Sequence, residues 1–226
     1  MKALLIHGAG GGAWEWQCWQ PAFAAGGLES EAIELEPAAE GLAATRYEDY
    51  LAQVSRAARG HHVLIGASLG ALLALEAAAR LDPIALVLIN PVPPAPWHRL
   101  LPPRRFPAVI PWSRTASLEG TRRAMPDAEP EVVAFAASRW RDESGAVLAA
   151  AWSGRVFPPP KAPRLVLISE ADEELPPAAM DRFARDIGAE TWSLPELGHL
   201  SPLLGPNAAS LAEGVARWLR ARARSR

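Results

Sequence analysis

The sequence contains one cysteine, Cys18, among 226 residues. A single thiol excludes an internal disulfide, and chains without disulfides are typical of reducing compartments. We therefore predict a cytoplasmic protein. Cys18 lies between two tryptophans, and we interpret it as a small buried hydrophobe, because free cysteine is among the most buried residue types.

The sequence also lacks strong net charge and long apolar runs. Its formal net charge is −2, which gives no basic surface for nucleic acid or for an anionic membrane. No stretch approaches the roughly 20 apolar residues of a membrane span, and the first apolar run, residues 3–6, is too short for a signal peptide. Its His, Asp and Glu residues show no metal-ligand spacing. We predict a protein with a small-molecule partner and no metal, cofactor, nucleic acid or membrane.

Apolar runs and helix-like segments alternate along most of the chain. Strands are predicted at residues 2–7, 30–35, 62–65, 84–89, 164–168 and 190–194. Helices are predicted at residues 14–25, 47–59, 69–81, 131–141, 145–151, 177–187 and 207–221, and residues 222–226 are predicted as a loose basic tail. This alternation predicts an α/β fold, a mostly parallel doubly wound sheet of about six strands with helices on both faces.

Residues 91–160 interrupt that alternation. The segment is rich in proline and arginine, and proline blocks stand at both of its ends, at residues 91–94 and 158–160. Such blocks predict an inserted lid with stiff connections. The predicted plan is a single domain, with residues 1–90 and 161–226 as the core and residues 91–160 as the lid.

The pentapeptide Gly66-Ala67-Ser68-Leu69-Gly70 follows an apolar strand and begins a helix rich in alanine and leucine. A sharp strand-to-helix turn exposes a serine as a nucleophile, and it needs very small residues two positions before and after that serine. A serine here is also typical of an ordinary helix N-cap. We favour the nucleophile because suitable partners occur downstream.

A serine hydroxyl needs a base that takes its proton and a carboxylate that orients the base. Asp172 follows the strand at 164–168, and His199 follows the strand at 190–194. The carboxyl ends of parallel strands meet at one edge of a sheet, where sites in such folds form. The neighbouring acids Glu170, Glu173 and Glu174 leave open a second interpretation of this turn as a solvated acidic loop.

These motifs resemble the α/β-hydrolase superfamily over essentially the whole chain outside the lid. The resemblance rests on His7-Gly8-Ala9-Gly10, on the pentapeptide around Ser68 and on Gly198-His199, with the nucleophile, acid and base in the expected order. The first glycine-rich stretch is most similar to the plant methylesterase and hydroxynitrile lyase branch. Lyases of this type carry a threonine after the first strand and a lysine beside the histidine. Here no threonine occurs between residues 7 and 16, and Leu200 follows His199, which disfavours cyanohydrin cleavage.

The resemblance implies a carboxylic ester hydrolase whose oxyanion hole consists of the backbone N–H groups of Ala9 and Leu69. Leu69 opens a helix, where the first amides have no intrahelical partner and the dipole favours negative charge. His7 is expected to orient the turn after the first strand. Other readings remain open: a thioesterase, lactonase, amidase or C–C bond hydrolase on the same scaffold, a non-enzymatic ligand receptor, or a dinucleotide site at the glycines of residues 8–13.

The predicted lid carries four tryptophans, and with Gly10 they are the candidate substrate-binding residues: Trp97, Trp112, Trp140 and Trp152. They either line an apolar pocket or form the lid's own core. Lid arginines at positions 104, 105, 122 and 123 either attract an anionic substrate or form a solvated face, and we favour the second. We predict a monomer or homodimer.

Overall fold

The computed structural model describes residues 1–223. Its main sheet has six strands in the order β2-β1-β3-β4-β7-β8, and every neighbouring pair is parallel. The strands are β1 (Lys2–Ile6), β2 (Glu29–Ile33), β3 (Val63–Ala67), β4 (Ala85–Ile89), β7 (Arg164–Ser169) and β8 (Glu190–Leu194). This architecture confirms the predicted parallel α/β sheet.

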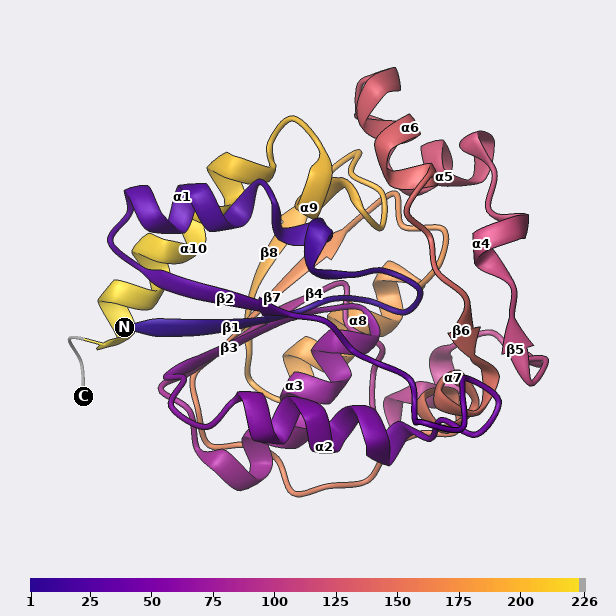
Figure 1. The fold of residues 1–226 in the computed structure, drawn as a ribbon. Helices are drawn as coiled ribbons and strands as arrows, with labels where there is room; N and C mark the ends of the chain where they lie inside the picture. Colours follow the sequence, from indigo (N-terminus) through magenta and orange to yellow (C-terminus); the bar gives the residue numbers. More distant parts are fainter. Residues whose placement is uncertain (224–226) are drawn as a thin grey trace.

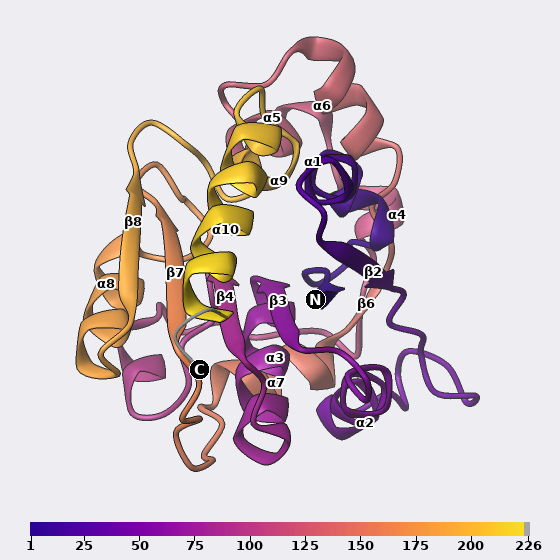
Figure 2. The ribbon, with the colours of Figure 1, turned by 90° about the vertical axis from the view of Figure 1, so that its left-hand side faces the viewer.

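Helices cover both faces of this sheet (Figures 1 and 2). One face packs against α1 (Trp19–Ala25) and α10 (Ala208–Ala223), and the other against α2 (Tyr47–Ala57), α3 (Leu69–Leu81) and α8 (Pro177–Asp186). Successive side chains of a strand point to opposite faces. The strands therefore divide their apolar residues between two buried clusters, as β1 does with Leu4 on the α3 side and Leu5 on the α10 side.

The two strands at the centre of the sheet, β3 and β4, are buried on both faces. All five residues of β3 and of β4 are buried, whereas the edge strands β2 and β8 are largely exposed or half-buried. A strand covered on both faces has a continuous apolar sequence, which explains why β3 and β4 are readily predicted. Because the strands are parallel, the loops that follow them all lie at the carboxyl-terminal edge of the sheet.

The segment between β4 and β7 forms small helices and a two-stranded sheet beyond the carboxyl ends of the main strands (Figure 1). Its elements are η2 (Trp97–Leu100), β5 (Val109–Ile110), α4 (Trp112–Thr115), α5 (Leu118–Ala124), α6 (Pro130–Ala137), β6 (Glu143–Ser144) and α7 (Gly145–Trp152). The last of these, α7, places Val147 and Leu148 in the core cluster beside α2 and α3. We call residues 91–160 the inserted segment.

Three predicted elements differ in the structure. The helix predicted at 131–141 ends at Ala137 as α6. The helix predicted at 14–25 is broken into η1 (Ala13–Trp16) and α1, with a turn at residues 17 and 18 between them. The tail prediction is wrong for residues 222 and 223, since α10 extends to Ala223 and Arg222 pairs with Glu190. Residues 224–226 of that prediction lie outside the described residues. The short helix α9 (Ser201–Leu204) is an element that the sequence pattern does not predict.

Within residues 1–223, no helix combines the length and the apolar character that crossing a bilayer requires.

We expect Gly66→Ala to destabilise the fold strongly, because a Cβ at this position would overlap the backbone of Gly70. Overpacking against rigid backbone should lower the free energy of unfolding by about 3 kcal/mol or more, measured by urea denaturation. The matched control is Gly27→Ala, where the backbone is left-handed (φ 70°) but no atom lies within 4 Å of the new Cβ. It should cost only about 1 kcal/mol. Equal losses in the two variants would contradict the steric argument.

Candidate active site

Ser68 lies in the turn between β3 and α3 with φ 53° and ψ −116°, a conformation that is rare for residues other than glycine. Such strain persists only where the surroundings fix it. Here the turn is pressed against its neighbours: a Cβ on Gly70 would overlap the backbone of Ile6 and His7, at the end of β1. The two glycines of the motif therefore bring the Ser68 turn directly onto the turn after β1.

Asp172 and His199, the acid and base that the sequence suggests, are in direct contact. His199 Nδ1 lies 2.6 Å from Asp172 Oδ2, and the other carboxylate oxygen accepts hydrogen bonds from the backbone N–H groups of Glu174 and Leu175 at 2.8 and 3.0 Å. The Asp172 side chain is fully buried. Nδ1 is thus occupied, which leaves Nε2 as the ring nitrogen available to Ser68.

The other acids of the same turn point elsewhere. Glu170 accepts a hydrogen bond from Ser193, while Glu173 and Glu174 pair with Arg123 and Arg104. Of the four acids between residues 170 and 174, Asp172 alone bonds to His199. The solvated-loop interpretation therefore fits its neighbours and not Asp172.

The pKa of His199 is raised above its usual 6.5. Burial by itself lowers this pKa, but the charge and hydrogen bond of Asp172 and the charges of Glu174 and Glu15 outweigh it. The surroundings thus favour the imidazolium, which is the species a base becomes after accepting a proton.

Asn90, which sequence reasoning missed, connects the loops of the site. It is buried and left-handed (φ 43°) at the end of β4. Its amide nitrogen donates to Ser169 Oγ and to the carbonyl of His199, both at 2.9 Å, and its amide oxygen accepts from the Ser169 N–H at 2.8 Å. These bonds place His199 relative to β4 and β7. The signal in the sequence was a polar residue directly after a fully apolar strand.

The turn after β1 presents Ala9 between two tethered amides. Gly8 N–H donates to Glu15 Oε2 at 3.1 Å, and Gly10 N–H donates to Glu143 Oε2 at 3.0 Å. Within residues 1–223, neither the Ala9 nor the Leu69 N–H donates a hydrogen bond to another residue. Two free amides beside Ser68 are what a developing oxyanion requires.

His7 holds the same turn from behind. Its Nδ1 donates to the Gly8 carbonyl at 2.7 Å, and its Nε2 accepts from the Leu35 N–H at 3.0 Å, which corresponds to a neutral ring. Burial lowers the pKa of His7 to about 4, although the bond to Gly8 opposes the shift. The contacts of His7 are those of a residue that orients the turn.

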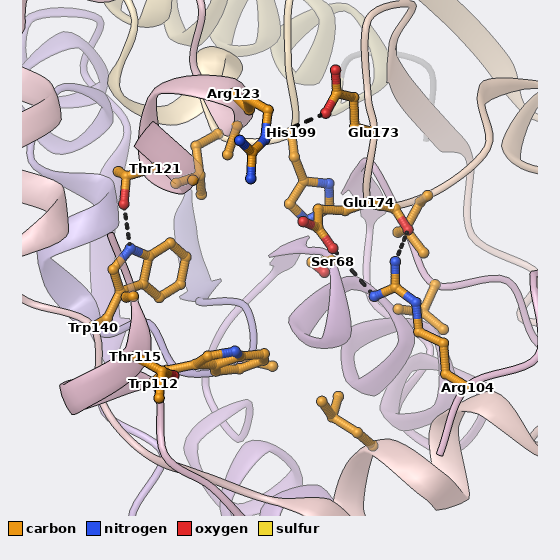
Figure 3. A pocket seen from close by; sticks show the side chains of 18 of the residues that line it. Ser68, Arg104, Trp112, Thr115, Thr121, Arg123, Trp140, Glu173, Glu174 and His199 are labelled. Atoms are coloured by element: carbon orange, nitrogen blue, oxygen red, sulfur yellow. Dashed lines mark hydrogen bonds and ion pairs between the residues drawn. The ribbon is translucent and has the colours of Figure 1, made fainter. Parts of the chain in front are cut away.

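A cavity of about 430 Å³ opens above Ser68 and His199. Figure 3 shows Trp112 and Trp140 on one side of it and Arg104 on the other, with Ser68 and His199 between them. Trp152 also lines it.

Two candidate substrate-binding residues lie elsewhere. Trp97 packs on Phe183 and donates to Asp186, and neither Trp97 nor Gly10 lines this cavity. The prediction for Trp97 is wrong because sequence position within the inserted segment does not show which way a side chain faces. Gly10 instead lies against the Trp112 ring, where a Cβ would clash.

The arginines of the inserted segment divide in the same way. Arg104 and Arg123 line the cavity, and each is paired with a glutamate of the turn that carries Asp172. Arg105 and Arg122 are exposed and lie outside it. Their charge is therefore either neutralised or solvated. In the described part of the chain, no group of three or more His, Cys, Asp or Glu residues is arranged to hold a metal ion.

A profile of the alpha/beta hydrolase family matches residues 3–213. The chain belongs to this family. A comparison with curated protein sequences found no significant match.

Solved structures of other hydrolases have the same fold. A pyrethroid hydrolase from Sphingobium faniae JZ-2 is 21% identical, with 99% of each chain covered and a TM-score of 0.74. The methylesterase MES16 from Arabidopsis is 15% identical over 97% of this chain and 99% of its own, with a TM-score of 0.73. A thioesterase domain from the curacin biosynthetic pathway is 18% identical over 97% of this chain and 90% of its own, with a TM-score of 0.63. At these identities the likeness concerns the fold.

We expect His7 to make the stability of this hydrolase depend on pH. The unfolded chain protonates His7 below the ordinary histidine pKa of 6.5, whereas the folded chain does so only near pH 4. Its contribution is therefore present above pH 6.5 and is lost as the pH falls toward 4, by up to about 3 kcal/mol. Urea denaturation of the native chain and of His7→Gln should show a stability difference that grows with pH across this window.

Glu15 works in the opposite direction and has to be separated from His7. Its pKa is raised from 4.5 to about 7, chiefly by burial, so the stability it contributes is present below pH 4.5 and is lost as the pH rises toward 7. Subtracting the two pH curves cancels this shared contribution. A pH-independent difference between the native chain and His7→Gln would refute the role assigned to His7.

Proposed function

We propose that this hydrolase cleaves a carboxylic ester or a related acyl bond, with Ser68 as nucleophile, His199 as base and Asp172 as the acid that orients the base. The observation that carries the proposal is the 2.6 Å contact between His199 Nδ1 and buried Asp172, at a cavity that Ser68 also lines. The strained backbone of Ser68 and the free amides of Ala9 and Leu69 support it.

The chemistry follows from these positions. Ser68 Oγ attacks the carbonyl carbon while His199 Nε2 takes its proton, and Asp172 stabilises the imidazolium. The carbonyl oxygen becomes an oxyanion between the N–H groups of Ala9 and Leu69, where each donor contributes about 3 kcal/mol to transition-state stabilisation. His199 then passes the proton to the departing alcohol, which leaves an acyl group on Ser68. Water hydrolyses this acyl-enzyme with His199 again as base.

An apolar, partly aromatic ester is the substrate class that suits the cavity. Its walls include Trp112, Trp140 and Trp152, and its two arginines are already paired with glutamates. Ligand sites are typically apolar with few placed polar groups. Among proteins of the same fold, one is named a pyrethroid hydrolase and another a methylesterase. In this proposal the inserted segment is a lid that supplies the aromatic wall.

A thioester is the second candidate substrate, because a thioesterase domain shares the fold and the triad chemistry serves both bonds. Lactone, amide and C–C bond hydrolysis use the same groups as well. Parallel assays with matched aryl esters and thioesters of one acyl group rank the two leading candidates. Saturable binding without turnover and without labelling by a fluorophosphonate would instead identify a non-enzymatic receptor.

We expect Ser68→Ala to abolish hydrolysis of short-chain aryl esters and labelling by a fluorophosphonate, because no other group replaces the attacking oxygen. Persistent labelling of this variant would refute Ser68 as nucleophile.

We expect Asp172→Asn to lower kcat by about 10³- to 10⁴-fold, since an amide no longer stabilises the imidazolium. The matched control is Glu170→Gln, two residues away and bonded to Ser193, which should retain activity. The reverse ranking would move the acid to Glu170.

We expect Trp112→Ala to raise KM for bulky apolar esters more than for acetate esters, because it removes aromatic wall from the cavity. Loss of one such contact surface costs about 1–3 kcal/mol, or roughly 10- to 100-fold in kcat/KM. Trp97→Ala serves as the control, because Trp97 packs on Phe183 outside the cavity. It should change thermal stability and leave the chain-length preference unaltered. Equal effects of the two substitutions on that preference would contradict this assignment.

A further inference from the structure

A second, small cavity of about 30 Å³ adjoins the candidate site. Ser68 and His199 line it, as they line the large cavity, and Glu15 lines only the small one. Its volume exceeds the roughly 10–15 Å³ that a single water molecule needs. The small cavity is therefore a water-sized space in contact with both the nucleophile and its base.

Glu15 is the one acid that lines this cavity, and only 1% of its surface is exposed. Its Oε2 accepts a hydrogen bond from the Gly8 N–H at 3.1 Å, and within residues 1–223 this is the single hydrogen bond of the Glu15 side chain. A buried carboxylate is normally bonded at both oxygens. Glu15 thus has one carboxylate oxygen without a protein partner, and it lines a water-sized cavity together with the polar side chains of Ser68 and His199. Several polar partners around a space of this size are what a buried water needs.

The charges around the cavity act together. Burial raises the pKa of Glu15 to about 7, against the Gly8 hydrogen bond and the charges of His199 and Arg141, while the charge of Glu34 raises it further. In turn, the Glu15 charge raises the pKa of His199. Glu15 and His199 thus interact across the space that they both line.

We propose that the small cavity holds the water that hydrolyses the acyl-enzyme and that Glu15 is the positioning residue that orients it; this rests on the function proposed above. One water hydrogen points to the Glu15 carboxylate, and the other to His199 Nε2. The water oxygen attacks the acyl carbonyl carbon as its proton passes to His199. The tetrahedral oxyanion then collapses, the bond to Ser68 Oγ breaks, Oγ takes the proton from His199, and the carboxylic acid leaves.

Glu143 provides a matched control. Like Glu15, it accepts a hydrogen bond from a backbone N–H of the turn after β1, but it does not line the small cavity. It holds the Gly10 N–H on the other side of Ala9. Its second oxygen is bonded to Tyr50 OH at 2.9 Å and to the Ser144 N–H at 2.7 Å, and it does not line the small cavity. If Glu15 only shapes the turn, Glu15→Gln and Glu143→Gln should have the same kinetic effect.

The test compares the two chemical steps in these variants with a p-nitrophenyl ester under pre-steady-state conditions. Glu15→Gln keeps an oxygen for Gly8 but loses the charge. We expect it to leave the first release of p-nitrophenol nearly unchanged and to slow steady-state turnover on the order of 10- to 100-fold. A stoichiometric burst should appear, and intact-protein mass spectrometry should detect the accumulated acyl-enzyme. Glu143→Gln should slow both steps together, because it loosens the turn that binds the oxyanion in each.

A second variant acts on the cavity and leaves Glu15 in place. Leu203→Phe adds volume to the lining of the small cavity and should reproduce the selective loss of deacylation, including the burst. The proposal is overturned if the ratio of the deacylation rate to the acylation rate is the same in the native enzyme as in Glu15→Gln or in Leu203→Phe. If a fluorophosphonate does not label the native chain, the proposed serine nucleophile itself is refuted. The burst experiment tests only the role of Glu15, so the two failures can be distinguished.

Discussion

The approach of the Ser68 turn to the end of β1 is the constraint on which the rest of the site depends. Gly66 and Gly70 have no room for a Cβ, because backbone of Gly70 and of β1 occupies the space. Ser68 has a positive φ in this turn, and Ala9, which follows β1, lines the same cavity as Ser68. In the proposed mechanism, a bulkier turn would move Ala9 away from Ser68, and the oxyanion would lose one of its two donors.

Buried polar side chains fix the loops around that contact. Glu15 and Glu143 tether the amides on both sides of Ala9, and Asn90 joins the ends of β4 and β7 to the backbone of His199. Loops are ordinarily the mobile part of such a fold. Here each loop is bound by side chains that have left water, and leaving such a group unpaired costs about 1–3 kcal/mol. The geometry is therefore maintained by the cost of breaking these bonds.

The inserted segment contacts the loops that follow β1, β7 and β8. Its backbone N–H of Arg141 donates to the Gly10 carbonyl at 2.8 Å, its Ala124 carbonyl accepts from the Leu200 N–H at 2.7 Å, and its Arg104 pairs with Glu174 beside Asp172. A segment bound in this way supplies the wall of the cavity and also supports the loops below it. Substitutions at its residues that line the cavity or bond to these loops, such as Arg104, are thus expected to affect both the cavity and the loops that carry Asp172 and His199.

The sequence alone determined the parallel sheet and suggested the residues to which we assign catalysis, because both depend on local patterns. Apolar runs such as β3 and β4 indicate buried strands, and the two glycines around Ser68 indicate a turn that tolerates no side chain. Tertiary structure decided which side chains meet. Glu15 lay inside a predicted helix, Asn90 was only a residue after a strand, and Trp97 was grouped with the cavity tryptophans although it packs on Phe183. Asn90 bonds to His199 across 109 positions of the sequence. The residues around either position do not predict such a bond, because it forms only after the strands have been brought side by side.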